Sequence, residues 1–308
     1  MGDSPFAMQP YQGIPTFGRR PLTRDARGAD LAILGVPYDG ATSHRSGARF
    51  GPRAIREQSL LLWGYNNALR AAPFELLKII DAGDVDVVPP DQKATQLAIE
   101  AAARQLGDAG AKVIALGGDH SITLPLLRAA AARHGPVAVV HFDSHPDTWD
   151  AEFGAQRYSH GTVFRRAIEE RLIDVAAYFQ VGIRGPTAGP QDYADARRLG
   201  ARMFTLDEAL ERGIPAVLAE IVASVGVKAV YCSLDIDAVD PAFAPGTGTP
   251  EPGGFTSHQM LQLVRGLLGL NIIGADLVEV APPYDPGQIT AILAANLIFE
   301  MLSVLARR

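Results

Sequence analysis

Short, continuous runs of apolar residues alternate along the chain with longer segments whose apolar residues recur at helical spacing. Continuous apolar runs are typical of strands whose two faces are both covered by helices. The runs that predict strands are residues 31–36, 76–81, 112–116, 137–142, 177–181, 201–204, 229–234 and 272–277. The segments that predict helices include residues 91–109, 124–134, 215–225 and 257–268, and a last, largely apolar helix over 288–306.

This alternation predicts an α/β fold, a three-layer α/β/α sandwich with a mostly parallel central sheet. Because the chain has no internal repeat and no low-complexity linker, we interpret residues 1–308 as a single domain, with 1–30 as an N-terminal extension. Gly- and Pro-rich stretches at 35–51 and 241–254 follow predicted strand ends. Since loops beyond the carboxyl ends of the strands form the binding crevice of open α/β sheets, we expect the site at that edge.

Composition narrows the class of protein. The chain is 47% hydrophobic and 20% charged, as soluble globular proteins are, and its net charge of −6 comes without a Lys/Arg block that would indicate nucleic-acid binding. A single cysteine, Cys232, excludes an internal disulfide and a cysteine-based zinc site. We see no secretory signal and no stretch near the roughly 18 apolar residues of a membrane span. We therefore expect a cytoplasmic protein that contacts neither nucleic acid nor membrane.

Three of the predicted strands are followed by aspartate and histidine residues. These are one histidine in VIALGGDHSIT (His120), three alternate residues in VAVVHFDSHPDTW (Asp143, His145 and Asp147) and two in VYCSLDIDAVDP (Asp235 and Asp237). Side chains two residues apart in an extended chain point to the same face, so each group can converge on one point.

The three groups together offer four carboxylates and two imidazoles. Four carboxylates packed closely without a cation would repel one another and be partly protonated, whereas two divalent ions would balance their charge. The oxygen-rich set lacks a thiolate and suits manganese better than structural zinc. A pair of ions roughly 3.5–4 Å apart lowers the pKa of a shared water toward neutrality. The pattern therefore predicts a hydrolytic centre with two metal ions.

Each motif alone would be weak, because a single Asp-x-Asp at a strand end is usually a turn or a helix cap. The metal prediction depends on three such motifs following three different strands. We interpret His141, deeper in its apolar run, as a second-layer or packing residue. Asp119 either orients a neighbouring ligand or caps the loop. Ser121 is interpreted as a helix cap rather than a nucleophile, because no G-x-S-x-G turn surrounds it.

The segments GGDHS, HFDSHPD and SLDIDAVDPAFAPGTGTPEPGG resemble the three signature segments of the ureohydrolases, the binuclear manganese enzymes that include arginase and agmatinase. The resemblance extends from about Leu31 to the C-terminus, with the motifs in the same order. The segments TSHRSGARFGPRAIRE, SHGTVFRRAIEE and LVEVAPPYD are similar to the agmatinase and guanidino-acid branch rather than to arginase. The resemblance implies an arginase-like fold and hydrolysis of a small guanidino compound to urea and an amine.

The resemblance also implies a role for each motif residue. Asp143 and Asp235 would bridge the two ions, His120 and Asp147 would complete one coordination shell, and His145 and Asp237 the other. The implied catalytic residues are Asp147, assisting proton transfer, His160, relaying a proton to the leaving amine, and Glu279, accepting hydrogen bonds from the guanidinium. Thr249 would shape the substrate pocket beside Glu279 and His160. Ser144 stands where the family usually has Ala, and we expect a packing change of small effect.

The substrate is less sharply indicated. Agmatine, which would yield putrescine, is the first candidate, and 4-guanidinobutanoate or another guanidino acid is the alternative. Arg165 and Arg166 could bind a substrate carboxylate, but either can simply cap or solvate the helix after His160. His44 and Arg45 lie on a loop at the edge of the site and could contact the substrate tail, although a solvated loop is the plainer interpretation.

The resemblance further implies two Mn2+ ions per chain, with Ni2+ or Co2+ as possible substitutes, and a homotrimer or homohexamer. Two other classes of function stay open at this point. A metal-dependent deacylase on a related scaffold would carry one metal and a tyrosine-assisted site, against which the doubled Asp motifs argue. A non-catalytic partner subunit of an active relative would have lost ligands, and all six are present here.

Overall fold

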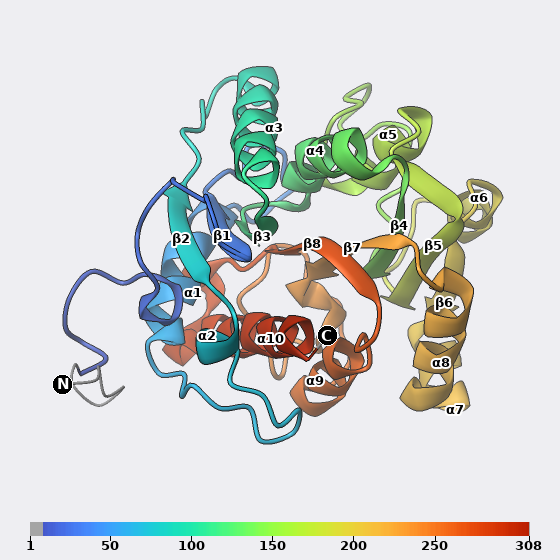
Figure 1. Ribbon diagram of the computed structural model, residues 1–308. Coiled ribbons are helices and arrows are strands. Elements are labelled where there is room, and N and C mark those ends of the chain that lie inside the picture. The colour runs from blue at the N-terminus through green and yellow to red at the C-terminus, as the bar shows by residue number, and fades with distance from the viewer. Residues whose placement is uncertain (1–8, 308) are drawn as a thin grey trace.

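A computed structural model describes residues 9–307 of the chain (Figure 1). In these residues the strands form one eight-stranded sheet in the order β2-β1-β3-β8-β7-β4-β5-β6, and every neighbouring pair is parallel. The strands are β1 (Leu31–Val36), β2 (Ile79–Asp84), β3 (Lys112–Gly117), β4 (Val137–Phe142), β5 (Ile173–Ile183), β6 (Arg202–Thr205), β7 (Ala229–Asp235) and β8 (Asn271–Val278).

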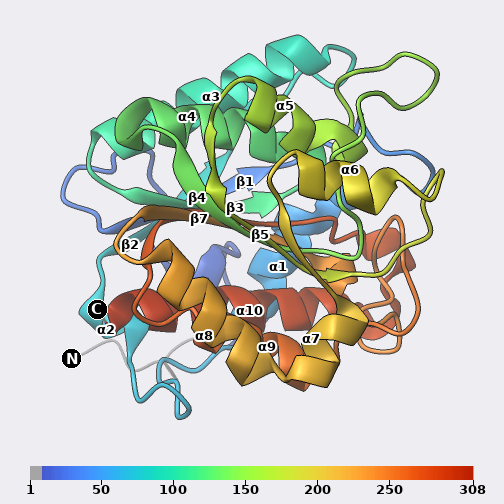
Figure 2. The ribbon, with the colours of Figure 1, turned by 90° about the vertical axis from the view of Figure 1, so that its right-hand side faces the viewer.

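Helices cover both faces of this sheet (Figure 2). They are α1 (Gly51–Ser59), α2 (Pro73–Leu76), α3 (Gln92–Asp108), α4 (Thr123–His134), α5 (Val163–Glu169), α6 (Asp192–Arg198), α7 (Leu206–Arg212), α8 (Ile214–Val225), α9 (Ser257–Arg265) and α10 (Ile289–Ala306). In Figure 2, α3, α4 and α5 lie above the sheet, and α1, α8, α9 and α10 lie below it. The predicted three-layer sandwich with a parallel sheet is confirmed.

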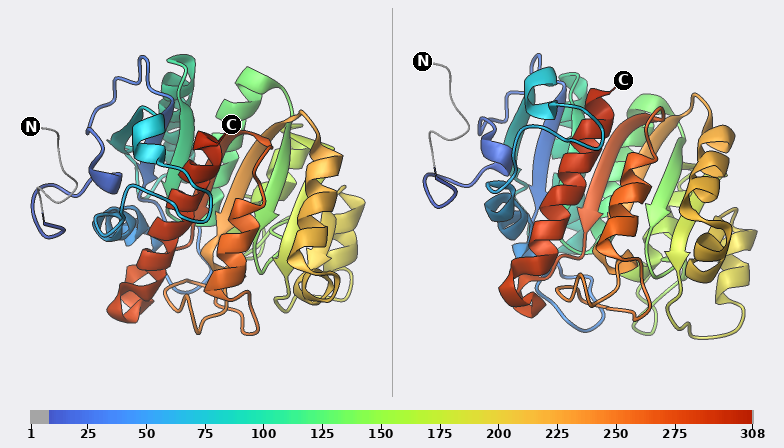
Figure 3. Two further views of the ribbon diagram at one scale, coloured as in Figure 1. Left: turned by 60° about the horizontal axis from the view of Figure 1, so that its bottom comes forward. Right: turned by 90° about the horizontal axis from the view of Figure 1, so that it is seen from below.

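Burial of both sheet faces explains why the strands have continuous apolar runs. Every residue of β1 and β4 is buried, and the hydrophobic core divides into two clusters, one on each side of the sheet. The lower cluster is formed with α10, α9 and α8, which run side by side across that face (Figure 3). The upper cluster is formed with α3, α4 and α5.

Most predicted elements are present with shifts of a few residues at their ends. The predicted strand over 76–81 begins only at Ile79, because Pro73–Leu76 forms the short helix α2. The predicted helix over 91–109 is α3, and Asp91 caps it by accepting the backbone N–H of Ala94. The strand expected over 177–181 extends to Ile173–Ile183.

The helix α10 requires a correction to the sequence analysis. By length and composition the segment Pro286–Ala306 could cross a membrane, with a mean hydropathy of 2.0, so the expectation that no stretch approaches that length is wrong. Its apolar window is 78% buried, because α10 packs against α1 and α9 over the sheet. The same hydropathy is expected of a helix in a protein core.

Part of the predicted N-terminal extension packs against the sheet. Residues 1–8 lie outside the described residues. Further along, Phe17 is fully buried, and its backbone N–H donates to Asp81 of β2 over 2.8 Å. The assignment of 1–30 as an extension of a single domain stays a prediction.

Candidate active site and metal centre

Four neighbouring strands in the middle of the sheet, β3, β8, β7 and β4, end at the same edge. His120 follows β3 at the start of a short 3-10 helix (His120–Ile122), Asp143 follows β4, Asp235 ends β7, and Glu279 follows β8. The adjacency of these strands brings together side chains that are up to 159 residues apart in sequence. The predicted convergence at the carboxyl edge of the sheet is therefore present in the structure.

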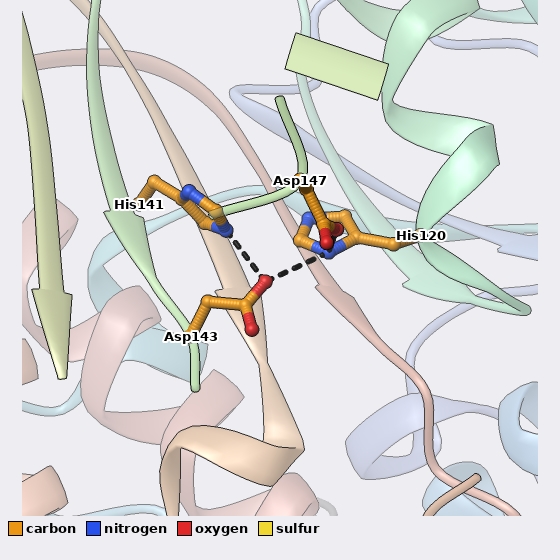
Figure 4. A group of neighbouring side chains, drawn as sticks. All are labelled: His120, His141, Asp143 and Asp147. Atoms are coloured by element: carbon orange, nitrogen blue, oxygen red, sulfur yellow. Dashed lines mark hydrogen bonds and ion pairs between the residues drawn. The ribbon is translucent and has the colours of Figure 1, made fainter. Parts of the chain in front are cut away.

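His120 lies close to three carboxylates, two of which, Asp143 and Asp147, are drawn with it in Figure 4. Its Nδ1 atom is 2.9 Å from Asp147 Oδ2, 3.2 Å from Asp143 Oδ2 and 3.2 Å from Asp235 Oδ2. All four residues are buried. The structure thus brings His120, Asp143, Asp147 and Asp235 into one cluster, as the sequence predicted.

A second group lies on the other side of Asp143. His145 Nδ1 is 3.1 Å from Asp237 Oδ2 and 3.6 Å from Asp143 Oδ1. Asp143 therefore directs one carboxylate oxygen toward each histidine, which is the geometry that a bridging ligand needs. The six residues of the predicted ligand set are together, and their individual roles as ligands stay a prediction.

The donor set fits divalent cations. Although His120 Nδ1 is buried and close to three carboxylate oxygens, it has no hydrogen-bond partner in the described part of the chain. Burial, together with the neighbouring Asp237 and Asp143, raises the pKa of Asp235 well above its ordinary value. Burial lowers the pKa of His120, but the surrounding carboxylates reverse this effect and raise it well above its ordinary value. The cluster must hold either protons or cations, and oxygen-rich ligands with imidazoles suit a metal such as manganese.

His141 is a neighbour of this cluster rather than one of the six residues. Its Nε2 atom is 2.7 Å from Asp143 Oδ2, and Gln180 Nε2 lies 3.3 Å from its Nδ1. Because a carboxylate only accepts hydrogen bonds, the Nε2–H of His141 donates to Asp143 and helps to orient that carboxylate. Of the two roles expected from the sequence, a second-layer residue or a packing residue, this contact favours the first.

Glu279 and His160 form a pair beside the cluster. Glu279 Oε1 accepts the backbone N–H of His120 over 2.8 Å and lies 3.3 Å from His160 Nδ1. Burial lowers the pKa of His160, but the Glu279 carboxylate outweighs it and raises the pKa to about 9. Glu279 and Asp147 both have left-handed backbone conformations, with φ of 64° and 49°, which non-glycine residues seldom adopt. Such strain is concentrated at functional sites.

Two residues of the segment GTGTPEPGG contact the site at different points. Thr249 donates from its hydroxyl to Asp237 Oδ2 over 3.3 Å, so it contacts one of the six clustered residues directly. A Cβ atom added at Gly248 would lie 3.6 Å from Glu279 Oε2. The absence of a side chain at Gly248 therefore leaves space next to the second carboxylate oxygen of Glu279.

Comparison with known proteins decides the family. The model of the arginase family matches residues 29–303. The chain belongs to the arginase family. It is 48% identical to a guanidinopropionase of Pseudomonas aeruginosa, over 96% of this chain and 93% of that one. It is 45% identical to a mitochondrial agmatinase of Gallus gallus, over 95% of this chain and 86% of the relative. The solved structure of proclavaminate amidinohydrolase from Streptomyces clavuligerus superimposes with a TM-score of 0.92 at 46% identity, covering 97% of this chain and 99% of that one.

These likenesses confirm the resemblance and the arginase-like fold. The chain is accordingly a metal-dependent hydrolase of the ureohydrolase class, which cleaves C–N bonds of guanidino compounds. The deacylase that the sequence left open is thereby set aside.

Around the site of this arginase-family enzyme, the cationic residues differ in their availability. Arg166 is buried and binds Asp150 over 2.7 Å and Glu169 over 3.0 Å, and Arg165 binds Glu169 over 3.1 Å. The suggestion that either arginine binds a substrate carboxylate is therefore not supported, because both already have acidic partners.

The loop after β1 provides a different cation. The guanidinium of Arg45 stacks on the Tyr284 ring, with Cζ 4.0 Å from the ring centroid. No carboxylate of the described residues forms an ion pair with it. The carbonyl oxygen of Arg45 would lie 3.1 Å from a Cβ at Gly248, whose other neighbour is Glu279. Arg45 thus belongs to the edge of the same site, whereas the neighbouring His44 is exposed.

Sequence reasoning undervalued or missed several residues that contact the cluster. The Ser144 hydroxyl is 2.7 Å from Asp237 Oδ1 and 3.0 Å from His145 Nδ1, so its effect extends beyond packing. Glu251 Oε1 is 3.6 Å from His145 Nε2. Asp276, an acidic residue inside the apolar run of β8, is buried beneath His120. A charged residue in a strand that is otherwise apolar was the signal that could have identified Asp276.

Proposed function

We propose that this enzyme hydrolyses a small guanidino acid to urea and the corresponding amino acid, at a centre of two Mn2+ ions. The ions would be held by the six clustered residues His120, Asp143, His145, Asp147, Asp235 and Asp237. The observation that carries the proposal is the buried, unpartnered Nδ1 of His120 among three carboxylates, directly beside the Glu279 carboxylate. It supports a cation-dependent site built next to an anion that can bind a guanidinium.

The proposed reaction needs a metal-bound water, a residue that binds the guanidinium and residues that transfer protons. When bound, two divalent ions would lower the pKa of a water molecule so that hydroxide is available near neutral pH. Glu279 would bind the planar guanidinium through Oε2, which faces the space beside Gly248, while Oε1 is held by the His120 backbone. Asp147 would accept the proton of the attacking water, and His160 would deliver a proton to the departing amine. The water oxygen would first add to the guanidinium carbon to give a tetrahedral intermediate, and the C–N bond to the amine would then break as the amine nitrogen takes the proton from His160.

The position of Arg45 favours a substrate that carries a carboxylate at the end away from its guanidinium. Its guanidinium is held against Tyr284 and has no acidic partner among the described residues, so a substrate carboxylate can bind it without displacing another ion pair. The names of two relatives agree, since one is a guanidinopropionase and another, from Homo sapiens, is a guanidino acid hydrolase. The agmatinase of Gallus gallus keeps agmatine, the first candidate from the sequence, as the alternative.

Urea release by Mn2+-loaded protein tests the proposal. The substrates are 3-guanidinopropanoate, 4-guanidinobutanoate, agmatine, arginine and free guanidine. We expect a guanidino acid to be preferred, and Arg45→Met to lower kcat/KM for it by about 10–100-fold, the value of a lost charge-assisted hydrogen bond, with little change for agmatine. Arg165→Met removes a cation that already has an acidic partner and is the matched control.

The outcomes separate the two parts of the proposal. Preference of the wild type for agmatine would overturn the guanidino-acid assignment and leave the hydrolase class in place. Absence of urea from every substrate, after loading with Mn2+, Ni2+ or Co2+ in turn, would overturn the reaction itself. The homotrimer or homohexamer expected from the sequence belongs to the same proposal, and the molar mass in solution measures it.

A further inference from the structure

Behind His120, on the side away from the carboxylate cluster, lies a chain of buried polar groups. His120 Nε2 is 2.9 Å from Ser233 Oγ, and Ser233 Oγ is 2.7 Å from Asp276 Oδ1. The other oxygen of the same carboxylate, Asp276 Oδ2, accepts hydrogen bonds from the hydroxyls of Tyr231 and Thr123, each over 2.8 Å. All five residues are buried.

The direction of the hydrogen bonds in this chain follows from the chemistry of its groups. A carboxylate only accepts hydrogen bonds, so the single hydroxyl hydrogen of Ser233 is directed to Asp276. Ser233 Oγ can then only accept from His120, which places a hydrogen on Nε2. A neutral imidazole with its hydrogen on Nε2 has a lone pair on Nδ1. That lone pair faces Asp143, Asp147 and Asp235, which also offer only lone pairs.

We propose that Asp276, acting through Ser233, is a positioning residue that fixes the Nε2–H tautomer of His120 and so keeps Nδ1 available to a metal ion. The inference rests on the proposed metal centre. It assigns no contact with substrate to Asp276. The carboxylate acts at a distance of two hydrogen bonds, by deciding which ring nitrogen carries the hydrogen.

His145 differs from His120 in this respect. Its Nε2 atom faces Glu251 at 3.6 Å, longer than a hydrogen bond, and its side chain is 14% exposed compared with 1% for His120. In the described structure Ser144 and Asp237 contact the Nδ1 side of this ring, and no serine bound to an aspartate contacts its Nε2. Occupancy at the His145 side can therefore serve as an internal control for changes at the His120 side.

The substitution Asp276→Asn directly tests the direction of the hydrogen bonds from His120 to Ser233 and from Ser233 to residue 276. Two hydroxyls donate to Oδ2 and one to Oδ1, so the oxygen of the new amide is expected to stay at the Oδ2 position, with its NH2 group facing Ser233. Ser233 would then accept from this NH2 group and donate its own hydrogen to His120 Nε2. The ring would have to carry its hydrogen on Nδ1, where the metal ion should bind.

Metal affinity is the readout, measured by equilibrium dialysis against buffered Mn2+ followed by elemental analysis. We expect Asp276→Asn to lower the affinity for one of the two Mn2+ ions by 10–100-fold and to leave the affinity for the other unchanged. The electron paramagnetic resonance spectrum should change from that of a coupled pair to that of an isolated Mn2+ ion. Tyr231→Phe removes one hydrogen bond to the Asp276 carboxylate, but Ser233 would still donate to Asp276. This variant should therefore bind both ions as the wild type does.

A double variant distinguishes an effect of the hydrogen-bond chain from Asp276 through Ser233 to His120, here called the relay, from a general loss of structure. Ser233→Ala removes the acceptor for the Nε2–H of His120 and should lower the affinity for the same ion only several-fold. Combined with Asp276→Asn, it also removes the hydroxyl that blocks the correct tautomer, so the double variant should bind Mn2+ more tightly than Asp276→Asn alone. Additive losses in the double variant, or wild-type affinity in a folded Asp276→Asn protein, would overturn the relay. If the wild type itself bound no metal, the proposed centre would fail instead.

Discussion

The carboxylate of Glu279 offers a direct test of how the enzyme binds a guanidinium, through the substitution Glu279→Gln. Glutamine has nearly the same size and keeps one oxygen, so the buried side chain should fit the site. The backbone N–H of His120 donates to Oε1 over 2.8 Å and therefore selects the amide oxygen for that position. The NH2 group must then occupy the Oε2 position beside Gly248, where it faces the N–H groups of the substrate.

The expected loss has two sources. The enzyme would lose a hydrogen bond to a charged acceptor, worth about 1.5–3 kcal/mol, and would gain a buried donor without a partner, which costs about 1–3 kcal/mol. Together these amount to about 3–6 kcal/mol, which corresponds to a fall in kcat/KM of about 10²–10⁴-fold. Because Glu279 is not among the six clustered residues, Mn2+ content should not change.

Urea release at several substrate concentrations, with Mn2+ content and thermal stability measured in parallel, is the appropriate assay. Glu300→Gln is the matched control, because Glu300 is also buried but binds Arg265 and Asn66 far from the site. It should lower the melting temperature and leave kcat/KM unchanged. A Glu279→Gln enzyme that retains its metal and works within ten-fold of the wild type would refute this assignment.

Three further predictions concern the proton donor, the metal ions and the backbone of the site. His160→Gln should lower kcat by about 10²–10⁴-fold with unchanged Mn2+ content, as expected for a lost general acid, and a smaller effect in steady-state kinetics would contradict that role. Removal of the metal by a chelator should lower the melting temperature, and Mn2+ at about a thousand times its Kd should restore about 4 kcal/mol per site; a calorimetric scan that does not respond to Mn2+ would argue against the centre. Gly118→Ala should lower the free energy of unfolding by about 3 kcal/mol in denaturant titrations, because its Cβ would collide with the carbonyl oxygens of Val36 and Tyr38, whereas Gly64→Ala meets no atom within 4 Å and should be neutral.

The sequence predicts the fold well because the strands of a parallel sheet are buried on both faces. Residues 137–142 have a continuous apolar run for that reason, and the structure has β4 at Val137–Phe142. Prediction was poorer where a short helix precedes a strand, as at Pro73–Leu76, since Leu76 and Leu77 lead into the apolar run of the strand without a clear break. Hydropathy was also misjudged at α10, because a buried core helix and a membrane span share the same composition.

The sequence predicted which residues gather at the edge of the sheet, but it did not predict the buried partners behind them. Asp143, Asp235 and Glu279 follow strand ends, and a sheet edge gathers whatever follows parallel strands, so the cluster can be anticipated without knowing the order of the strands. The partners on the far side of His120 depend on that order. Ser233 is on β7 and Asp276 on β8, and they reach each other and His120 only because β3, β8 and β7 are neighbours.

The two sides of His120 therefore place opposite demands on a single imidazole. The front is surrounded by three carboxylates that would hold a proton on Nδ1, and the rear, through Ser233 and Asp276, holds a hydrogen on Nε2. An imidazolium would satisfy both sides in the absence of a cation, at the cost of the coordination site. A divalent ion replaces the front proton and satisfies the same lone pairs with a larger charge. The hydrogen-bond chain through Ser233 and Asp276 thus favours a metal ion over a second proton on His120. It keeps the ring hydrogen on Nε2, and the Nδ1 lone pair is then available to bind a cation.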